Sequence, residues 1–453
     1  MGLKVGLRRG VDFISSEQDS RWGHWFHPTP KNRVGMADWQ EELYCPEYQR
    51  GFQLHYFAVH SSLLKVGGIS RSYYDQIMLQ CLGEDFKSLP EGFAYVVCHP
   101  LQASKMRVQE GIRELIGSGI LLDVGVKGRE FYATSSVRTV YNSEVEMMLK
   151  LSIPVKITNS VRSNKVSDLE YCEQVVKAVK YLGLGDSSDG FTFLADRGQV
   201  SVQYGDAELG FESLFRENPF YRKNTEGVVN PVALFEEALP GMKSQTFQLV
   251  TELAYKDELP LKLAAQVWFE NYITVTLLCF IELYDEFGVT FESHLQNCLI
   301  KIEECLPVKL YYRDTEGCYI DESLSDDLTE EFPRLASLSG VFFSRKEMHE
   351  AVGYYHLINH VFAVVCRFGV DGLLEEELGI DLIHRLLRKK EKVCGERGRA
   401  LIWYLLDSKM IQCKSNLITQ LEGIDELAGA DAKAAYVEVK NPLYVGVEKQ
   451  LQN

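Results

Sequence analysis

The sequence predicts an α+β protein with at least two domains. Its N-terminal half alternates turn residues with short runs rich in β-branched and aromatic residues, a pattern typical of strands. From about residue 262 the pattern changes to long helical segments. The 453 residues exceed what one hydrophobic core usually serves, and the 46% hydrophobic content is enough to bury two or three cores.

Charge and cysteine content exclude several classes of function. The chain has 48 Lys and Arg against 64 Asp and Glu, a formal charge of -16. As a whole it therefore repels nucleic acids and anionic membranes, so neither is expected as a partner, and an anionic ligand needs a local basic cluster. The 11 cysteines form no CxxC pair, and residues 1–20 lack the apolar segment of a signal peptide. We therefore expect a cytoplasmic protein with reduced thiols.

A loop punctuated by prolines precedes the first predicted strand. Residues 21–35, RWGHWFHPTPKNRVG, place His27, Lys31 and Arg33 among aromatic residues. The two prolines exclude regular helix and restrict the backbone of their neighbours. The segment is therefore either a recognition loop or a packed aromatic corner with cations on its surface.

Regular elements follow this loop in order. They are strands at 52–66 and 93–100, a helix at 102–117 that stops at glycines, a helix at 163–185 capped by Ser167, and a hairpin at 191–205. The apolar positions of these elements are interpreted as core.

A basic, hydroxyl-rich stretch at residues 132–162 is the first candidate for a ligand site. Two strand-like runs, REFYATSSVRTVY and EMMLKLSIPVKITN, predict a hairpin that turns at Asn142 and Ser143. The cations of the stretch are Arg138, Lys150, Lys156 and Arg162. A guanidinium matches two oxygens of a phosphate or carboxylate, and neighbouring hydroxyls add further hydrogen bonds. The stretch is either a polyanion site or an amphipathic hairpin with solvated charges.

The second half is predicted to be mainly helical. Turn residues on both sides of a short helix place a domain junction near residue 240. The segment 262–288 is apolar on all sides and ends at a glycine, and its most apolar run is too short to cross a bilayer, so we expect a buried central helix. Helical patterns continue from about 325 to 430, where His356 and His360 lie one turn apart and are interpreted as core residues.

Polar residues between these helices are suited to a magnesium ion. Glu292, His294, Gln296 and Asn297 lie on one short stretch, and Asp314 follows the next predicted strand. Magnesium prefers hard oxygen ligands and usually shares them with a substrate phosphate. This region is the second candidate for phosphate chemistry.

Seven ordered motifs carry a family resemblance. They are HPTPKNRVG, CHPLQ, ATSSVRTVY, KLSIPVKITNSVR, FRENP, ESHLQN and YYRDTEG. Together they resemble the signature set of the IucA/IucC family, the siderophore synthetases that work without a nonribosomal peptide assembly line. The resemblance extends from about residue 20 to the C-terminus. It implies a cupped hand with ATP in its palm: residues 1–240 would form the residual thumb and the fingers, and 241–453 a helical, FhuF-like palm.

The resemblance also implies an activity. Family members use ATP and Mg2+ to adenylate a carboxylate of citrate or a related acid, release pyrophosphate, and join the acid to an amine or alcohol. The partners expected here are such an acid and a polyamine, amino acid or amino alcohol, and a homodimer is plausible by the same likeness. Relatives carry a substantial extra segment ahead of HPTPKNR, so most of the thumb is expected to be missing from this chain.

The same resemblance assigns roles to individual residues. The residues expected to bind ATP are Ser135, Ser136, Arg138, Lys150, Arg162, His294, Gln296 and Asn297. Those expected to bind the acid are His27, Lys31, Arg33, Thr158, Asn159 and Arg162. The expected magnesium ligands are Glu292 and Asp314. His27, Arg138, Arg162 and His294 are the expected catalytic residues. His27 is also the candidate base for the second half-reaction, in which an ammonium group must lose a proton.

Three alternative functions accompany this assignment. HLQN followed by RDTEG superficially resembles a kinase catalytic loop, but Gln296 stands near where such a kinase needs an aspartate base, and an amide cannot accept the proton. A non-catalytic relative would bind ATP or citrate without turnover. An iron–sulfur reductase, suggested by a loose likeness of the C-terminal half to ferric-siderophore reductases, is disfavoured because no clustered terminal cysteines exist to hold a cluster.

Overall fold

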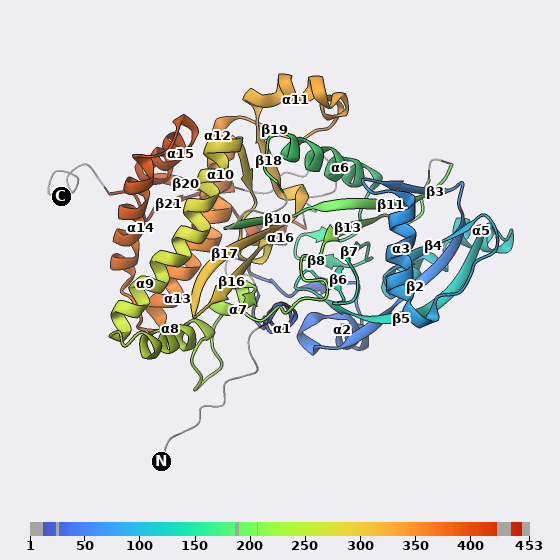
Figure 1. The fold of residues 1–453 in the computed structure, drawn as a ribbon, viewed down its shortest axis with the longest axis horizontal. Helices are drawn as coiled ribbons and strands as arrows, with labels where there is room; N and C mark the ends of the chain where they lie inside the picture. Colours follow the sequence, from blue (N-terminus) through green and yellow to red (C-terminus); the bar gives the residue numbers. More distant parts are fainter. Residues whose placement is uncertain (1–11, 24–26, 186–189, 206, 424–435, 446–453) are drawn as a thin grey trace, which may run out of the picture.

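A computed structural model describes residues 12–23, 27–185, 190–205, 207–423 and 436–445. Most of the helices gather at one end of the molecule and the largest sheet lies at the other, with a smaller sheet between them (Figure 1). This separation of helices from antiparallel sheet confirms the predicted α+β class. The start of the chain, residues 24–26 of the predicted loop and part of the predicted helical region up to 430 lie outside the described residues.

The largest sheet is antiparallel and contains the predicted hairpin. Its spatial order is β12 (Ala207–Glu208), β11 (Asp196–Tyr204), β13 (Ser213–Glu217), β7 (Met147–Leu151), β6 (Thr139–Tyr141), β5 (Leu121–Ala133), β2 (Gly51–His60) and β4 (Phe93–Cys98), with β3 (Leu64–Gly67) also paired to β11. The sheet is accompanied by α2 (Asp38–Tyr44), α3 (Arg71–Leu82), α4 (Pro100–Met106) and α5 (Glu110–Gly117). Phe57, Phe131 and Phe215 are fully buried in its core.

The predicted hairpin is present, but its first run is not one strand. β6 and β7 pair with Thr139 opposite Lys150, and the chain turns between them near Asn142 as predicted. Residues 134–138 instead form a loop between β5 and β6. Val137 in this loop has a φ of 65°, which lies outside the conformations of a β-strand. The loop therefore carries the serines and the arginine that sequence patterns placed on a strand.

A smaller sheet joins the two halves of the chain. Its order is β10 (Phe191–Leu194), β17 (Leu306–Arg313), β16 (Cys298–Glu303) and β14 (Val228–Val229), with β10 parallel to β17. The predicted hairpin at 191–205 is wrong, because β10 enters this sheet while β11 enters the large one. Only Ala195 separates the two strands, which is too short a connection for a hairpin turn. The junction near residue 240 stays a proposal, and this sheet takes strands from both sides of it.

The helical end is built around one long apolar helix. α9 (Leu261–Ile273), the π-helical turn η3 (Thr274–Leu278) and α10 (Cys279–Phe287) run on from one another and end at Gly288, whose φ is 65°. The segment Leu261–Phe287 is long and apolar enough to cross a membrane by length and composition alone. Trp268 and Tyr272 are nevertheless fully buried inside the protein core, which confirms the predicted core helix.

Further elements surround this helix and the cavity described below. The helices are α1 (Phe13–Gln18), α6 (Val166–Tyr181), α7 (Pro231–Phe235), α8 (Gln245–Lys256), α11 (Ser325–Glu331), α12 (Arg345–Ala351), the π-helix η8 (Val352–Val361), α13 (Phe362–Val370), α14 (Glu376–Glu391), α15 (Glu396–Asp407) and α16 (Asn416–Leu421). Small sheets form from β1 (Arg33–Val34), β8 (Lys156–Ile157) and β9 (Ser160–Val161); from β15 (Val289–Phe291), β18 (Cys318–Asp321) and β19 (Phe342–Phe343); and from β20 (Met410–Lys414) and β21 (Tyr436–Lys440).

Two helix predictions need local correction. The helix expected at 102–117 is divided into α4 and α5. Ser167 does not cap α6: the N-cap is Lys165, whose backbone N–H donates to the side chain of Asp168 at 2.9 Å. An acidic residue in the first turn can therefore replace a hydroxyl cap, since its carboxylate accepts from the exposed N–H groups there.

Candidate active site

One cavity of about 470 Å3 collects every residue to which the family resemblance assigned a role, whereas Lys156 of the basic stretch is not among its lining residues. The assigned residues that line it are His27, Lys31, Arg33, Ser135, Ser136, Arg138, Lys150, Thr158, Asn159, Arg162, Glu292, His294, Gln296, Asn297 and Asp314. They come from β1 and the loop before it, from the β5–β7 region, from the turn between β8 and β9 and the residue after it, and from the loops around β16 and β17. The fold therefore brings the two candidate regions into a single site.

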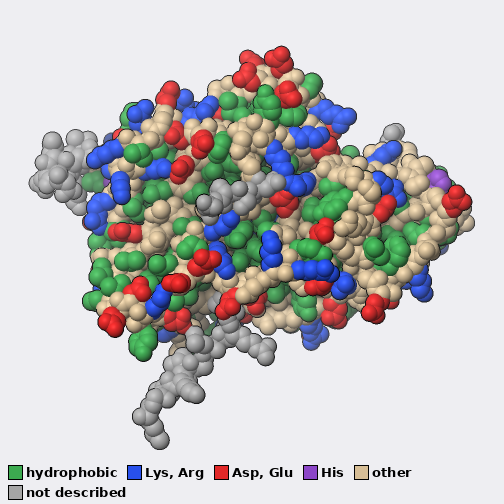
Figure 2. Space-filling model, in the orientation of Figure 1, with side chains coloured by type: hydrophobic (Ala, Val, Ile, Leu, Met, Phe, Trp, Pro, Cys, Tyr) green, Lys and Arg blue, Asp and Glu red, His purple; other side chains and the backbone are tan. Residues whose placement is uncertain are grey.

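The cavity lining is basic although the protein is acidic. On the face shown in Figure 2, Lys and Arg side chains are interspersed with Asp and Glu. Among the described residues that line the cavity, cations outnumber carboxylates: Lys31, Arg33, Arg138, Lys150, Arg162, Arg216, Arg313 and Lys414 face Glu292, Asp314 and Glu316. This local excess of positive charge is what a polyanionic ligand requires.

A network of buried charges lies at the wall of the cavity. The Nζ atom of Lys150 lies 3.0 Å from Oδ1 of Asp314, 2.5 Å from Oε2 of Glu316 and 3.4 Å from Oδ2 of Asp196. Arg216 donates from Nε and Nη2 to the two carboxylate oxygens of Asp196, at 2.7 and 2.9 Å. Such a bidentate pair fixes the direction of both side chains.

The network keeps its members charged. Burial alone would raise the pKa of Asp196, but the charges of Arg216 and Lys150 outweigh it and hold that pKa well below the usual value. Burial likewise disfavours the Lys150 ammonium, yet the surrounding carboxylates raise its pKa above the ordinary range. The pKa of Asp314 is also lowered, because Lys150 and Arg216 outweigh its burial. The wall is thus a fixed arrangement of charge near neutral pH.

Asn164 orients Arg138, a role that no sequence pattern predicted. Arg138 Nη1 donates to Oδ1 of Asn164 at 2.6 Å, and Asn164 in turn donates from Nδ2 to the backbone oxygens of Lys150 and Glu212 at 3.0 and 3.1 Å. Asn164 is buried. Nearby, Arg162 donates to the hydroxyl of Thr158 at 3.1 Å. Both arginines of the region are therefore held by short-range hydrogen bonds.

Arg313 connects the loop at residues 134–138 to the loop at 292–297. Its Nη2 donates to the hydroxyl of Ser135 at 3.1 Å and to the backbone oxygen of Gln296 at 2.7 Å, and it pairs with Glu17 at 2.9 Å. Glu17 also accepts from the backbone N–H of Ser135 at 2.8 Å. The two loops consequently have a common anchor.

The loop before β1 is held by Glu47. Arg33 Nη2 donates to Glu47 at 2.6 Å, and Lys31 contacts the same carboxylate oxygen. His27 accepts at Nδ1 from the backbone N–H of Thr29 at 3.1 Å. A neutral ring that accepts at Nδ1 carries its proton on Nε2. The role of His27 as the base of the second half-reaction stays a prediction.

The carboxylates of the cavity fit a magnesium ion that is shared with a phosphate. Asp314 has a φ of 101°, a strained value that residues other than glycine adopt mainly where function requires it. Glu292 is partly buried, and desolvation raises its pKa; it accepts from the hydroxyl of Tyr319. Among the described residues no group of three or more His, Cys, Asp or Glu could hold a metal alone. One or two carboxylates suffice when phosphate oxygens complete the shell.

The helical end adds residues that the sequence patterns did not identify as site residues. Tyr354, Tyr355 and Asn359 of η8 line the cavity together with Lys414 and Asn416. Asn416 donates to the hydroxyl of Tyr354 at 3.2 Å. These residues occur in η8, at the end of β20 and in α16, without a recognisable motif, so only the three-dimensional fold reveals them.

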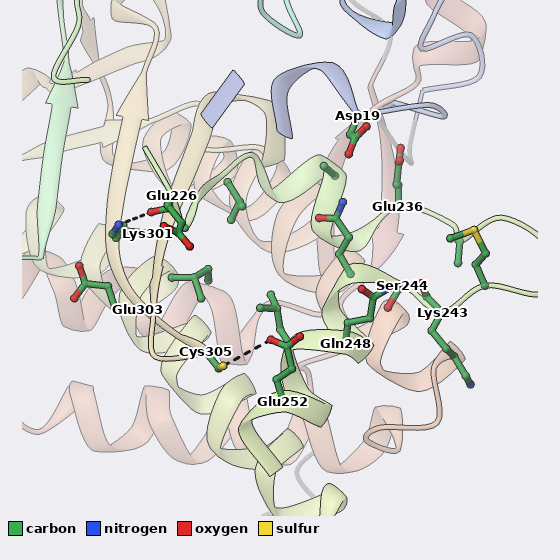
Figure 3. A pocket seen from close by; sticks show the side chains of 18 of the residues that line it. Asp19, Glu226, Glu236, Lys243, Ser244, Gln248, Glu252, Lys301, Glu303 and Cys305 are labelled. Carbon is green, nitrogen blue, oxygen red and sulfur yellow. Dashed lines mark hydrogen bonds between the residues drawn. The ribbon is translucent and has the colours of Figure 1, made fainter. Parts of the chain in front are cut away.

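A second cavity of about 500 Å3 has the opposite character. Figure 3 shows Lys301 beside Glu226 and Cys305 facing Glu252. Acidic side chains predominate among the described residues around it: Asp19, Glu226, Glu236, Glu237, Glu252, Glu303 and Glu304 face Arg21, Lys243 and Lys301. Such a lining repels a triphosphate or a tricarboxylate. Although the second cavity is slightly larger, the basic one is the candidate active site.

Comparisons with known proteins identify the family of the chain. Residues 12–236 match the model of the IucA / IucC family, and residues 266–429 match the model described as ferric iron reductase FhuF-like transporter. The chain is 32% identical to the spermidine-citrate ligase of Bacillus anthracis over 446 residues, which cover 96% of this chain and 74% of that protein. It is also 32% identical to the rhizobactin siderophore biosynthesis protein RhbC of Rhizobium meliloti, with 96% and 76% covered.

A solved structure has the same fold. The ATP-bound aerobactin synthetase IucA from a hypervirulent pathotype of Klebsiella pneumoniae superposes with a TM-score of 0.87 at 23% identity. The match covers 96% of this chain and 78% of that one. Sequence motifs, a convergent basic cavity and the extent of these similarities lead to one conclusion: this chain belongs to the IucA/IucC family.

Proposed function

We propose that this protein is an ATP-dependent synthetase that adenylates a carboxylate of citrate or a related acid and joins it to an amine or alcohol. The excess of cations over carboxylates in one cavity of an acidic protein carries the proposal. A tricarboxylate and a triphosphate can approach each other only where their charges are neutralised. A spermidine-citrate ligase among the relatives supports the citrate chemistry.

The first half-reaction needs orientation and charge neutralisation rather than a base. A carboxylic acid with a pKa of about 4 is already ionised at neutral pH. In our proposal Arg138, Lys150 and Arg162 hold the triphosphate and the acid so that a carboxylate oxygen attacks the α-phosphorus. A bond forms between carboxylate and phosphorus, and pyrophosphate leaves with the electrons of the broken anhydride bond. Ser135 and Ser136 complete the hydrogen bonds to phosphate.

Magnesium would supply positive charge between the phosphate oxygens when bound. We assign its protein ligands to Glu292 and Asp314, with His294, Gln296 and Asn297 forming the loop under the nucleotide. Both carboxylates line the cavity, which supports this assignment, because hard oxygen ligands there would share the ion with a phosphate.

We assign binding of the acid substrate to the loop before β1 and to the turn between β8 and β9. Lys31 and Arg33 already share the carboxylate of Glu47, and β1 pairs with β8 so that Arg33 lies opposite Ile157. This pairing brings the loop beside Thr158, Asn159 and Arg162. The proposed acid subsite is therefore largely formed before the ligand arrives.

The second half-reaction joins the activated acid to the acceptor. The acceptor nitrogen or oxygen attacks the acyl carbon. The bond between this carbon and the AMP oxygen breaks, and AMP leaves with its electrons. The relatives named as a spermidine-citrate ligase and an L-2,3-diaminopropanoate–citrate ligase favour an amine over an alcohol. We assign the reaction to the cytoplasm, where the 11 free thiols would remain reduced.

Product analysis tests the proposal. The purified protein is incubated with ATP, magnesium and citrate together with a panel of polyamines, amino acids and amino alcohols. We expect AMP, pyrophosphate and a condensation product whose mass equals acid plus amine minus water. Formation of ADP would show a kinase instead, and binding of ATP without any product would show a non-catalytic relative.

A further inference from the structure

A chain of buried hydrogen bonds lies behind the active-site loop at residues 292–297. The hydroxyl of Tyr272 lies 2.5 Å from Nε2 of His360, and Nδ1 of His360 lies 2.8 Å from the backbone oxygen of Ser293. Tyr272 and His360 are fully buried. Neither takes part in the chemistry proposed above, yet both nitrogens of the histidine ring are engaged.

The chemistry of the groups determines which atom donates and which accepts in each of these hydrogen bonds. A backbone oxygen can only accept, so Nδ1 of His360 carries the hydrogen and donates it to Ser293. In a neutral ring Nε2 then has a lone pair and accepts from the hydroxyl of Tyr272. Burial, reinforced by the neighbouring His356, lowers the pKa of His360 well below its usual value. The ring is therefore neutral and holds one defined tautomer.

The contact of His360 to the Ser293 oxygen is one of several that anchor the loop backbone, and Nδ1 of His356 lies 3.2 Å from the same oxygen. The backbone oxygen of Glu292 accepts from Nδ2 of Asn297 at 3.0 Å, and that of Gln296 accepts from Arg313 at 2.7 Å. The Ser293 oxygen lies between these two points. Glu292 and His294, on either side of Ser293, both line the cavity. A shift of this one carbonyl would therefore move both of them.

The helix that provides His360 also provides part of the cavity wall. It is the π-helix η8, which presents Tyr354, Tyr355 and Asn359 to the cavity. His356 of the same helix places Nδ1 3.0 Å from the hydroxyl of Ser293. π-helical turns inside helices occur frequently at functional sites. Here the wider turn lets one helix line the cavity and hold the loop from behind.

We propose that His360, oriented by Tyr272, is a positioning residue of the active site. Its Nδ1–H fixes the Ser293 carbonyl and thereby the directions of Glu292 and His294. The catalytic consequence rests on the proposed function, whereas the anchoring of the loop does not.

Two substitutions separate the role of each ring nitrogen. His360→Asn keeps a donor close to the position of Nδ1, whereas His360→Gln places its amide near the position of Nε2 and removes the 2.8 Å contact to the Ser293 oxygen, which keeps its longer contact to His356. His349→Gln is the matched control, because His349 is also buried but packs against Tyr284 and Tyr404 instead. In acid-dependent exchange of labelled pyrophosphate into ATP, His360→Gln should lower kcat by about 10-fold to 100-fold, as is typical when a supporting hydrogen bond is lost. His360→Asn and His349→Gln should stay close to the unmodified protein.

A second readout does not depend on catalysis. Amide hydrogen exchange of the ligand-free protein should be faster at residues 292–297 in His360→Gln than in His360→Asn or His349→Gln. Equal exchange in the two His360 variants, or equal kcat values, would overturn the positioning role. If the loop responds as expected but the unmodified protein exchanges no pyrophosphate, the proposed function fails while the anchoring stands.

Discussion

Lys150 Nζ lies 3.0 Å from Oδ1 of Asp314, although 164 residues separate them in the sequence. The contact joins β7 of the large sheet to the end of β17, which belongs to the smaller sheet. The cavity is therefore complete only when both sheets have formed and packed together. Stability and activity should consequently respond together to changes at this contact.

Removing the Arg138 guanidinium should impair the first half-reaction. Arg138→Ala removes a donor that we assign to the triphosphate, so adenylation should fall by about 100-fold or more, as for loss of one transition-state donor. Acid-dependent pyrophosphate exchange measures the effect. Arg71→Ala, which breaks a surface pair with Asp75, should leave the rate unchanged. A near-normal rate in Arg138→Ala would mean that the phosphates bind elsewhere.

Loss of the Asn164 side chain should reproduce part of that defect. Asn164→Ala removes the 2.6 Å partner of Arg138 and leaves it the longer ion pair with Glu316 at 3.7 Å, so the arginine is held less firmly. We expect a decrease of about 10-fold in the exchange rate, and the double variant should be no slower than Arg138→Ala alone, because the two substitutions act through the same group. Asn224→Ala, at an exposed position, is the control. Additive losses would contradict this coupling.

Removal of the Lys150 charge should destabilise the folded protein. Lys150→Met leaves Asp314, Glu316 and Asp196 without their shared ammonium. Removing one partner of a buried ion network typically costs about 3–5 kcal/mol. Urea unfolding followed by circular dichroism measures the loss. Adding Asp314→Asn should recover part of the stability, and an unchanged unfolding midpoint in Lys150→Met would contradict the described network.

Glu212 should make stability depend on pH. Its side chain is 2% exposed, and burial raises its pKa from 4.5 to about 7. The folded state thus favours the protonated form of Glu212. Its contribution to the free energy of unfolding is fully present below pH 4.5 and is lost as the pH rises through 7. From these two values the unmodified protein should lose about 2.5 kcal/mol more than Glu212→Gln between pH 5 and pH 8. Parallel pH curves in urea unfolding would refute the raised pKa.

Sequence patterns predicted the local parts of this protein better than its long-range pairings. The long apolar helix, the turn near Asn142 and the residues around the cavity follow from periodicity, turn chemistry and motif resemblance. The predicted hairpin at 191–205 is wrong because a strand pattern does not indicate which other strand the segment pairs with. The Asp196–Arg216 pair and the tyrosines of η8 were not predicted for the same reason, because their contacts depend on distant elements that no local pattern connects.

Exchange of labelled pyrophosphate into ATP tests the central claim most directly, since it reports the first half-reaction without knowledge of the acceptor. With magnesium and citrate or another tricarboxylic acid, the protein should exchange label only when the acid is present, and Arg138→Ala should suppress the exchange. The absence of acid-dependent exchange, or the appearance of ADP in its place, would contradict adenylation in the basic cavity.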